Sequence, residues 1–293
     1  MRVREVHGAV TRVRLYPVKS LAGVDVATAD VEPWGLRGDR RWMVVDASGA
    51  VLTARERHAL LTVRATPDDE GGVTLGADGS TSVHVRPPTG PADVPVGISR
   101  LTRATAAGPA ADRWLSDVLA EPVRLVWLDD PTRRPLSPEH GGRSGDPLSL
   151  ADAGPLLLTS MSSLAQLDVW MREEAAGRGE PEPAALDMRR FRPNIVVDGD
   201  LEPFVEDSWR SLRLGDVTYR FAEQCDRCVM TTLDPETARG GKEPLRTLAR
   251  HRRWDGVTWF GVRLVPTSGG TLAVGDEVTV LEAVGLPRPD PIS

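Results

Sequence analysis

The chain has only two cysteines among its 293 residues, and it lacks any long uninterrupted apolar run. Two thiols cannot build a disulfide framework, which is typical of a reducing compartment, so we expect a cytoplasmic protein. Crossing a membrane needs about 18 consecutive apolar residues, so no membrane anchor is expected. The opening stretch MRVREVHGAVTRVRLYPVKS carries charges where a signal peptide needs apolar residues, which argues against export.

A broad excess of positive charge is also missing, since the formal net charge is −6 at pH 7. Binding to nucleic acid needs a wide basic surface opposite the phosphates, so we expect no nucleic-acid partner. Any anion that the protein binds must therefore meet a local cluster of Lys and Arg side chains. No period of fixed length runs through the chain, which excludes a repeat architecture.

Glycine and proline are frequent, with 28 and 24 residues, and they separate many short segments that alternate apolar and polar residues. The pattern predicts a mainly β protein with a few helices. Amphipathic helices are predicted in ADRWLSDVLAE and SSLAQLDVWMREEA, the second with Ser162 or Ser163 as its N-cap. The segments LRLGDVTYRF and LAVGDEVTVLE each predict a hairpin with a Gly-Asp turn.

Two Pro- and Gly-rich segments predict loops rather than core elements. Residues 87–97 are interpreted as a surface loop or as the joint between two modules. The polar stretch DPTRRPLSPEHGGRSGDPLSLADAG is long for a loop in a compact protein. Loops of that length are often functional, so we expect this one to cover or form a site.

Both cysteines, Cys225 and Cys228, lie in the segment AEQCDRCVMTTLDPETA. A structural zinc needs four protein ligands, and none of the five histidines stands at the spacing of a zinc finger. A redox pair should begin a helix, whereas β-branched residues and a turn follow here. In an extended segment the two thiols face opposite sides, so one can enter a pocket while the other packs behind it. Zinc binding and redox pairing are disfavoured, yet they stay open beside core packing and metal ligation by one thiolate.

Cationic side chains gather where strands are predicted to begin or end. Each of them alone is interpreted as solvated surface charge, but together, in an acidic protein, they indicate loops that converge on a phosphate. These residues are Lys19, Arg37, Arg40, Arg41, Arg189, Arg190 and Arg192.

The motifs YPVKSLAG, GLRGDRRWMVVD, FRPNIVV, CDRCVMTTLDPETA and LAVGDEV follow one another in an order that resembles a known family. The chain resembles MOSC-domain proteins with a MOSC N-terminal β-barrel domain, the architecture of the mitochondrial amidoxime-reducing component and its bacterial relatives. The resemblance implies an N-terminal β-barrel-like domain packed against a MOSC β-barrel domain. We expect the first domain over residues 1–95, the cofactor-binding MOSC domain over 96–286, and a tail over 287–293.

The resemblance further implies that the ligand is the molybdenum cofactor (Mo-molybdopterin). Cys228 is then the metal ligand and the catalytic residue, and Cys225 is a bystander. Asp226 and Arg227 fall where the family's loop contacts the cofactor. The other implied cofactor-binding residues are Lys19, Ser20, Arg40, Asp152, Arg192 and Arg263.

Three positions depart from the family pattern. Arg263 stands where the family has an aromatic or amide residue, so we expect altered contacts to the pterin or the substrate. His58 occupies the segment where the family has a proline after TAR, which we interpret as a local loop change. Gly38 replaces the first arginine of the family's Arg-Asp-Arg motif.

As a function, the resemblance implies a molybdenum-dependent oxidoreductase that reduces small N-oxygenated compounds to amines. An iron–sulfur cluster needs four ligands, usually thiolates, which two cysteines cannot supply. We therefore expect an external electron donor, such as a reductase, a ferredoxin-like protein or a cytochrome. The alternatives are a sulfur carrier that holds a persulfide and a non-catalytic cofactor-binding protein. A family-level association with pyridoxal phosphate binding also follows from the resemblance.

Overall fold

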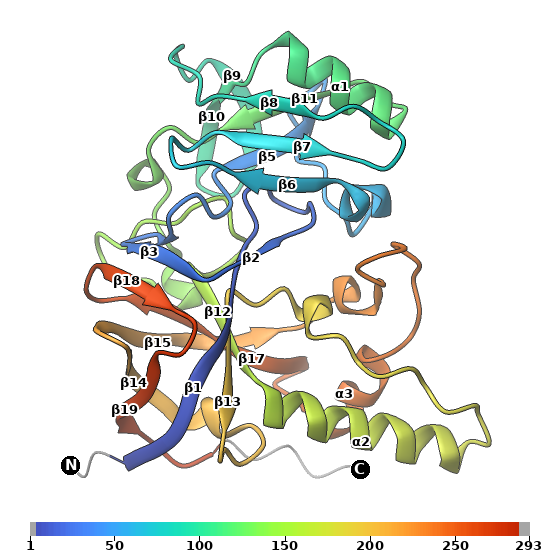
Figure 1. The fold of residues 1–293 in the computed structure, drawn as a ribbon, viewed down its shortest axis with the longest axis vertical. Coiled ribbons are helices and arrows are strands. Elements are labelled where there is room, and N and C mark those ends of the chain that lie inside the picture. Colours follow the sequence, from blue (N-terminus) through green and yellow to red (C-terminus); the bar gives the residue numbers. More distant parts are fainter. Residues whose placement is uncertain (1–3, 287–293) are drawn as a thin grey trace.

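A computed structural model describes residues 4–286, so the predicted tail at 287–293 lies outside the described residues. The protein is mainly β, as predicted, and Figure 1 shows two β-rich halves stacked along the long axis. The helices within residues 4–286 are α1 (Pro109–Leu119), α2 (Met161–Gly177) and α3 (Leu245–His251). In this part of the chain, no helix has the length and apolar character needed to cross a membrane.

The lower half in Figure 1 is a closed barrel of seven strands. In order around the barrel, the strands are β12 (Leu156–Ser160), β13 (Ile195–Gly199), β1 (Arg4–Leu15), β19 (Glu277–Ala283), β14 (Trp209–Leu214), β15 (Val217–Asp226) and β17 (Val257–Pro266). The barrel closes because β12 pairs with β13 on one side and with β17 on the other. The pair β12–β13 is parallel, and the other barrel pairs are antiparallel.

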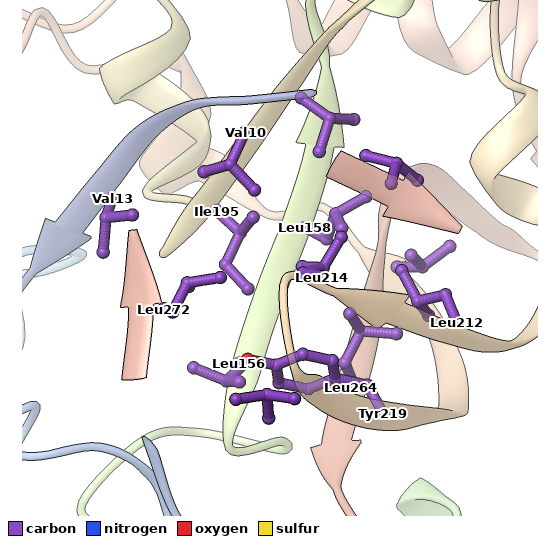
Figure 2. Close-up of a cluster of buried hydrophobic side chains, with 14 of the residues drawn as sticks. Val10, Val13, Leu156, Leu158, Ile195, Leu212, Leu214, Tyr219, Leu264 and Leu272 are labelled. Carbon is purple, nitrogen blue, oxygen red and sulfur yellow. The ribbon is translucent and has the colours of Figure 1, made fainter. Parts of the chain in front are cut away.

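Apolar side chains fill the interior of the barrel (Figure 2). Leu212 and Leu214 in β14 stand two residues apart, as do Val217 and Tyr219 in β15, and all four are fully buried. Side chains alternate between the two faces of a strand, so this spacing directs them to the same side. Burying a side chain of this size contributes about 1.5–3 kcal/mol. The barrel interior is therefore a packed core, and a ligand site must lie outside it.

The upper half holds two further sheets beneath α1 (Figure 1). One contains β6 (Arg64–Pro67), β7 (Val73–Gly76) and β8 (Val83–Val85), and the other contains β5 (Trp42–Asp46), β11 (Val123–Trp127), β10 (Leu101–Ala106) and β9 (Val94–Ile98). Leu115 of α1 is buried in their shared core. The boundary predicted after residue 95 falls within β9, which pairs with β10, and the division into domains stays a prediction.

Strands from distant parts of the chain join the two halves. The small sheet at the junction consists of β3 (Thr28–Glu32), β4 (Gly35–Leu36) and β18 (Gly270–Ala273). In addition, β2 (Val24–Val26) pairs with β1, and β16 (Arg253–Trp254) pairs with β17. Because β18 comes late in the chain and β3 early, their pairing fixes the upper half onto the barrel.

Three local predictions need correction. The Gly-Asp turn after Leu214 does close the hairpin β14–β15, but the second Gly-Asp turn is no hairpin, because β18 pairs with β3 while β19 pairs with β1 and β14. Residues 87–97 are a loop only in part, since β9 begins at Val94. The N-cap of α2 is Ser160, whose side chain accepts a hydrogen bond from the Ser163 amide.

Ser163 has a different partner, the buried carboxylate of Glu206. Its hydroxyl donates to Glu206 Oε1 at 2.7 Å, and the Ser160 hydroxyl donates to Oε2 at 3.1 Å. Glu206 has no solvent-exposed surface. Burial, together with the neighbouring charge of Asp207, raises the pKa of Glu206 to about 7. Glu206, beneath the start of α2, therefore keeps its proton to a higher pH than an exposed glutamate does.

We expect Glu206→Gln to change the pH dependence of stability. A carboxyl group whose folded pKa is raised contributes stability that is complete below its unfolded pKa and is lost as pH rises through about 7. Glutamine stays neutral, so between pH 5.5 and 8.5 the variant should gain about 1–2 kcal/mol of unfolding free energy relative to wild type. Urea unfolding at both pH values measures this, with exposed Glu202→Gln as the control. An equal pH dependence in all three proteins would contradict the assignment.

Candidate functional site

A cavity of about 390 Å³ opens between the two halves of the molecule. Its wall combines loops of the upper half with the ends of barrel strands and with the polar loop that precedes β12. All nine residues proposed from the sequence line this cavity: Lys19, Ser20, Arg40, Asp152, Arg192, Asp226, Arg227, Cys228 and Arg263. The structure thus brings the whole set together, while the role of each residue stays a prediction.

The two cysteines differ in their exposure and in their partners. Cys225 lies near the end of β15 with 5% of its surface exposed, and its Sγ atom accepts from Arg227 Nη1 at 2.7 Å. Cys228 follows the strand, is only partly buried, and lies with its Sγ atom 3.5 Å from Arg55 Nε. The turn after β15 therefore presents Cys228 as the accessible thiol of the cavity.

An ionised carboxylate links the cations on one side of the cavity. Asp152 forms ion pairs with Lys19 and with Arg55, whose Nη2 atom lies 2.7 Å from Oδ2. Burial alone would raise the pKa of Asp152, but the charges of Lys19 and Arg55 hold it well below its usual range. Burial lowers the pKa of Lys19, and Asp152 partly opposes that effect. Asp152 therefore orders these cations and also neutralises part of their charge.

Arg192 carries a charge that the protein leaves uncompensated. Its guanidinium lies 4.2 Å from the centre of the Tyr16 ring, and no acidic side chain in residues 4–286 forms an ion pair with it. Burial lowers the pKa of Arg192 to about 10. Arg40 stacks on the same ring at 4.6 Å. Arg40 already pairs with Asp39, so an anion would chiefly relieve the cost of burying Arg192.

The backbone is strained around this cationic wall. Ser20, Arg40 and Arg192 all adopt positive φ angles, of 69°, 48° and 56°. The left-handed region costs roughly 1–2 kcal/mol for a residue other than glycine. Strain of this kind persists where the surrounding structure fixes it, and it is concentrated at ligand sites.

The donor set of the cavity suits a ligand that is both anionic and metal-bearing. Cys228 offers one soft sulfur ligand, and the cations offer charge-assisted hydrogen bonds. Within residues 4–286, no group of three or more His, Cys, Asp or Glu side chains is arranged to hold a metal ion. A metal at Cys228 would therefore need further ligands that these side chains do not supply.

Comparison with known proteins agrees with this architecture. Residues 7–122 match the MOSC N-terminal beta barrel domain, and residues 145–279 match the MOSC domain. The chain is 32% identical to mitochondrial amidoxime-reducing component 1 of Homo sapiens, over 94% of this chain and 83% of that protein. The chain belongs to the MOSC-domain family with a MOSC N-terminal β-barrel domain.

Two further relatives have names different from that of the human protein, and the match covers very different shares of their lengths. Mitochondrial amidoxime reducing component 2 of Rattus norvegicus is 32% identical over 92% of this chain and 82% of that protein. Molybdenum cofactor sulfurase of Danio rerio is 29% identical over 88% of this chain, but the match spans only 32% of that protein.

Several cavity residues of this MOSC protein were missed from the sequence. Arg55 contacts both Asp152 and Cys228, and it lies in the segment TARERHALL, three residues before His58. His58 itself is exposed in the 3₁₀ turn His58–Thr62 and is not among the cavity-lining residues, as a local loop change predicts. Asn194, in FRPN, accepts from Arg40 at 3.1 Å. The polar loop before β12 contributes His140 and Asp152 to the cavity wall, and its role in a functional site stays a prediction.

The unequal burial of the two thiols predicts unequal reactivity. In folded protein without added ligand, we expect the disulfide reagent DTNB to modify one thiol quickly, because only Cys228 is accessible to the reagent. Cys228→Ser should abolish the fast phase, Cys225→Ser should preserve it, and denaturant should expose both thiols in wild type. A fast phase that survives Cys228→Ser would show that the turn after β15 is oriented differently.

Proposed function

We propose that this protein binds the molybdenum cofactor and reduces small N-oxygenated compounds, such as amidoximes, to the corresponding amines and water. The observation that carries the proposal is the accessible thiol of Cys228 beside a cationic wall that holds the uncompensated Arg192. The pterin cofactor is an anion through its phosphate, and it supplies two sulfur ligands to its metal. The phosphate matches the cations of the cavity, and the two sulfur ligands supply what its side chains lack for holding a metal beside Cys228.

Each cavity residue has a proposed task. Cys228 would bind the metal through its sulfur. The residues proposed to hold the pterin and its phosphate are Lys19, Ser20, Arg40, Arg192 and Arg227. Asp152 orders Lys19 and Arg55, and Arg263 is occupied by ion pairs with Glu223 and Asp226. Arg263 therefore shapes the wall of the cavity, and its charge is less available to a ligand than that of Arg192.

When bound, the cofactor would supply the two-electron chemistry at the metal. The chain itself would bind and orient the N-oxygenated substrate, exclude water from part of the cavity, and hold protons near it. Its two cysteines cannot ligate an iron–sulfur cluster, so electrons must come from an external donor such as a reductase, a ferredoxin-like protein or a cytochrome. A cytoplasmic location and pyridoxal phosphate binding stay predictions from the sequence.

Sulfur carriage is the second candidate function, because the partly exposed Cys228 is suited to hold a persulfide. The likeness to a molybdenum cofactor sulfurase supports the same idea. Mass spectrometry distinguishes the two functions, since a carrier should bear one extra sulfur atom on Cys228 in protein without molybdenum. A storage protein would instead hold molybdenum that reductants cannot cycle.

Replacing the two cysteines separately tests the cofactor assignment. Cys228→Ser should lose most of the bound molybdenum and all reduction of benzamidoxime, because serine offers no soft sulfur ligand. Cys225→Ser should keep both, since Cys225 is buried and bonds to Arg227. Metal analysis, pterin fluorescence and amine formation with a chemical reductant measure the three properties. Equal molybdenum content in the two variants would contradict ligation by Cys228.

The phosphate site is tested by Arg192→Met. Losing one charge-assisted hydrogen bond costs about 1.5–3 kcal/mol, so release of the pterin should be about tenfold to a hundredfold faster. The matched control is Arg190→Met, because Arg190 already pairs with Asp234 at 3.1 Å. Pterin fluorescence after dilution of the loaded proteins gives the release rates. If both variants release the pterin at the rate of wild type, Arg192 does not bind the phosphate.

A further inference from the structure

One histidine at the cavity has no part in the roles described so far. His140 ends the 3₁₀ turn Pro138–His140, in the polar loop before β12, and it lines the same cavity as Cys228. Its side chain is 40% exposed, so solvent can reach it. Histidine changes its charge between about pH 5 and 8, and it is the side chain that most often transfers protons in enzymes.

Close packing fixes the backbone of His140 against the barrel. Gly141 has a φ angle of 72°, and a Cβ atom there would lie 2.4 Å from the carbonyl oxygen of Ala222 in β15. Arg220 of β15 donates from Nη1 to the Gly141 carbonyl at 2.9 Å and also pairs with Asp146 farther along the loop. No larger residue fits at Gly141 without movement of one of these backbones. The loop is therefore held in place, and His140 is presented from a defined position.

A carboxylate faces one nitrogen of the His140 ring. The Nδ1 atom lies 2.9 Å from Oε1 of Glu223, which also pairs with Arg263. Arg263 reaches Asp226 as well, so the charged groups packed around His140 are two carboxylates and the guanidinium between them, with Arg220 behind the loop. Glu223 occupies the Nδ1 side of the ring through this close charged contact, which does not have the geometry of a hydrogen bond. The Nε2 atom is then the nitrogen left for a ligand.

We propose that His140, oriented by Glu223, is the proton donor for reduction of the N-oxygenated substrate, a role that rests on the proposed function. In R–NH–OH + 2e⁻ + 2H⁺ → R–NH₂ + H₂O, the N–O bond breaks and the nitrogen is reduced. The proton from His140 Nε2 leaves with the oxygen as water. The second proton comes from solvent and goes to the nitrogen, and both electrons come from the external donor. Solvent then protonates the neutral imidazole again.

A second histidine–carboxylate pair provides a matched control. His84 Nε2 lies 2.8 Å from Asp68 Oδ2, and its side chain is 46% exposed. This pair resembles His140–Glu223 in distance and exposure, yet neither residue lines the cavity. Substituting His84 therefore reproduces the loss of a surface histidine without touching the site.

The experiment compares wild type, His140→Gln and His84→Gln, each loaded with cofactor, in the reduction of benzamidoxime by reduced methyl viologen. General acid catalysis is worth about 10²–10⁴-fold, so His140→Gln should lower kcat by at least about 10²-fold with unchanged molybdenum and pterin content. The pH profile of kcat should differ between wild type and His140→Gln, whereas His84→Gln should keep the profile of wild type. Glu223→Gln should lower kcat less than His140→Gln, because Glu223 acts by positioning.

A second measurement on wild type needs neither turnover nor a variant. In loaded protein without electron donor, benzamidoxime should shift the imidazole NMR signals of His140 and leave those of His84 in place. Unshifted His140 signals at saturating benzamidoxime would overturn the proposal, as would a His140→Gln enzyme with the rate and pH profile of wild type. With either outcome, the proposed function is retained as long as wild type reduces benzamidoxime. If wild type reduces no benzamidoxime, the proposed function fails and the proton-donor role fails with it.

Discussion

The ion pairs of Asp152 with Lys19 and Arg55 organise the centre of this protein. Arg55 also contacts Cys228. Asp152 thus joins the segment of Lys19 to that of Arg55, and through Arg55 to the turn that carries Cys228. Burial disfavours the charged form of Lys19, and Asp152 is the group that opposes this effect. The arrangement explains how an acidic protein keeps cations at its centre. At one side of the cavity, Asp152 compensates the charges of Lys19 and Arg55. At the other side, Arg192 has no acidic partner within residues 4–286.

The uncompensated charge of Arg192 is the feature on which the proposed anion site depends. A guanidinium without an acidic partner is costly to bury, and stacking on Tyr16 recovers only part of the cost, about 0.5–2 kcal/mol. The positive φ angles of Ser20, Arg40 and Arg192 add backbone strain in the same place. A closed barrel with a packed apolar interior provides the rigid base that such strain requires (Figure 2). The packed core and the proposed ligand site thus lie in different parts of the molecule.

The sequence predicted the type of the fold and nine of the residues that line the cavity, because local patterns and motifs carry this information. Alternation predicted strands such as β14 and β15, and the order of several motifs pointed to Lys19, Arg192 and Cys228. Local patterns do not predict which strands or side chains pair when they are far apart in the sequence. The turn at Gly275 has the signal of a hairpin, but pairing of β18 with β3 decides its geometry. Arg55 was missed for the same reason, since its contact with Cys228 spans 173 residues.

The central proposal is a bond between the sulfur of Cys228 and a metal that the pterin also holds. X-ray absorption spectroscopy at the molybdenum edge counts the sulfur neighbours of the metal directly. If this bond forms, the metal in wild type has three sulfur neighbours, two from the pterin and one from the protein, and any metal that Cys228→Ser retains has only two. Two sulfur neighbours in both proteins would contradict it.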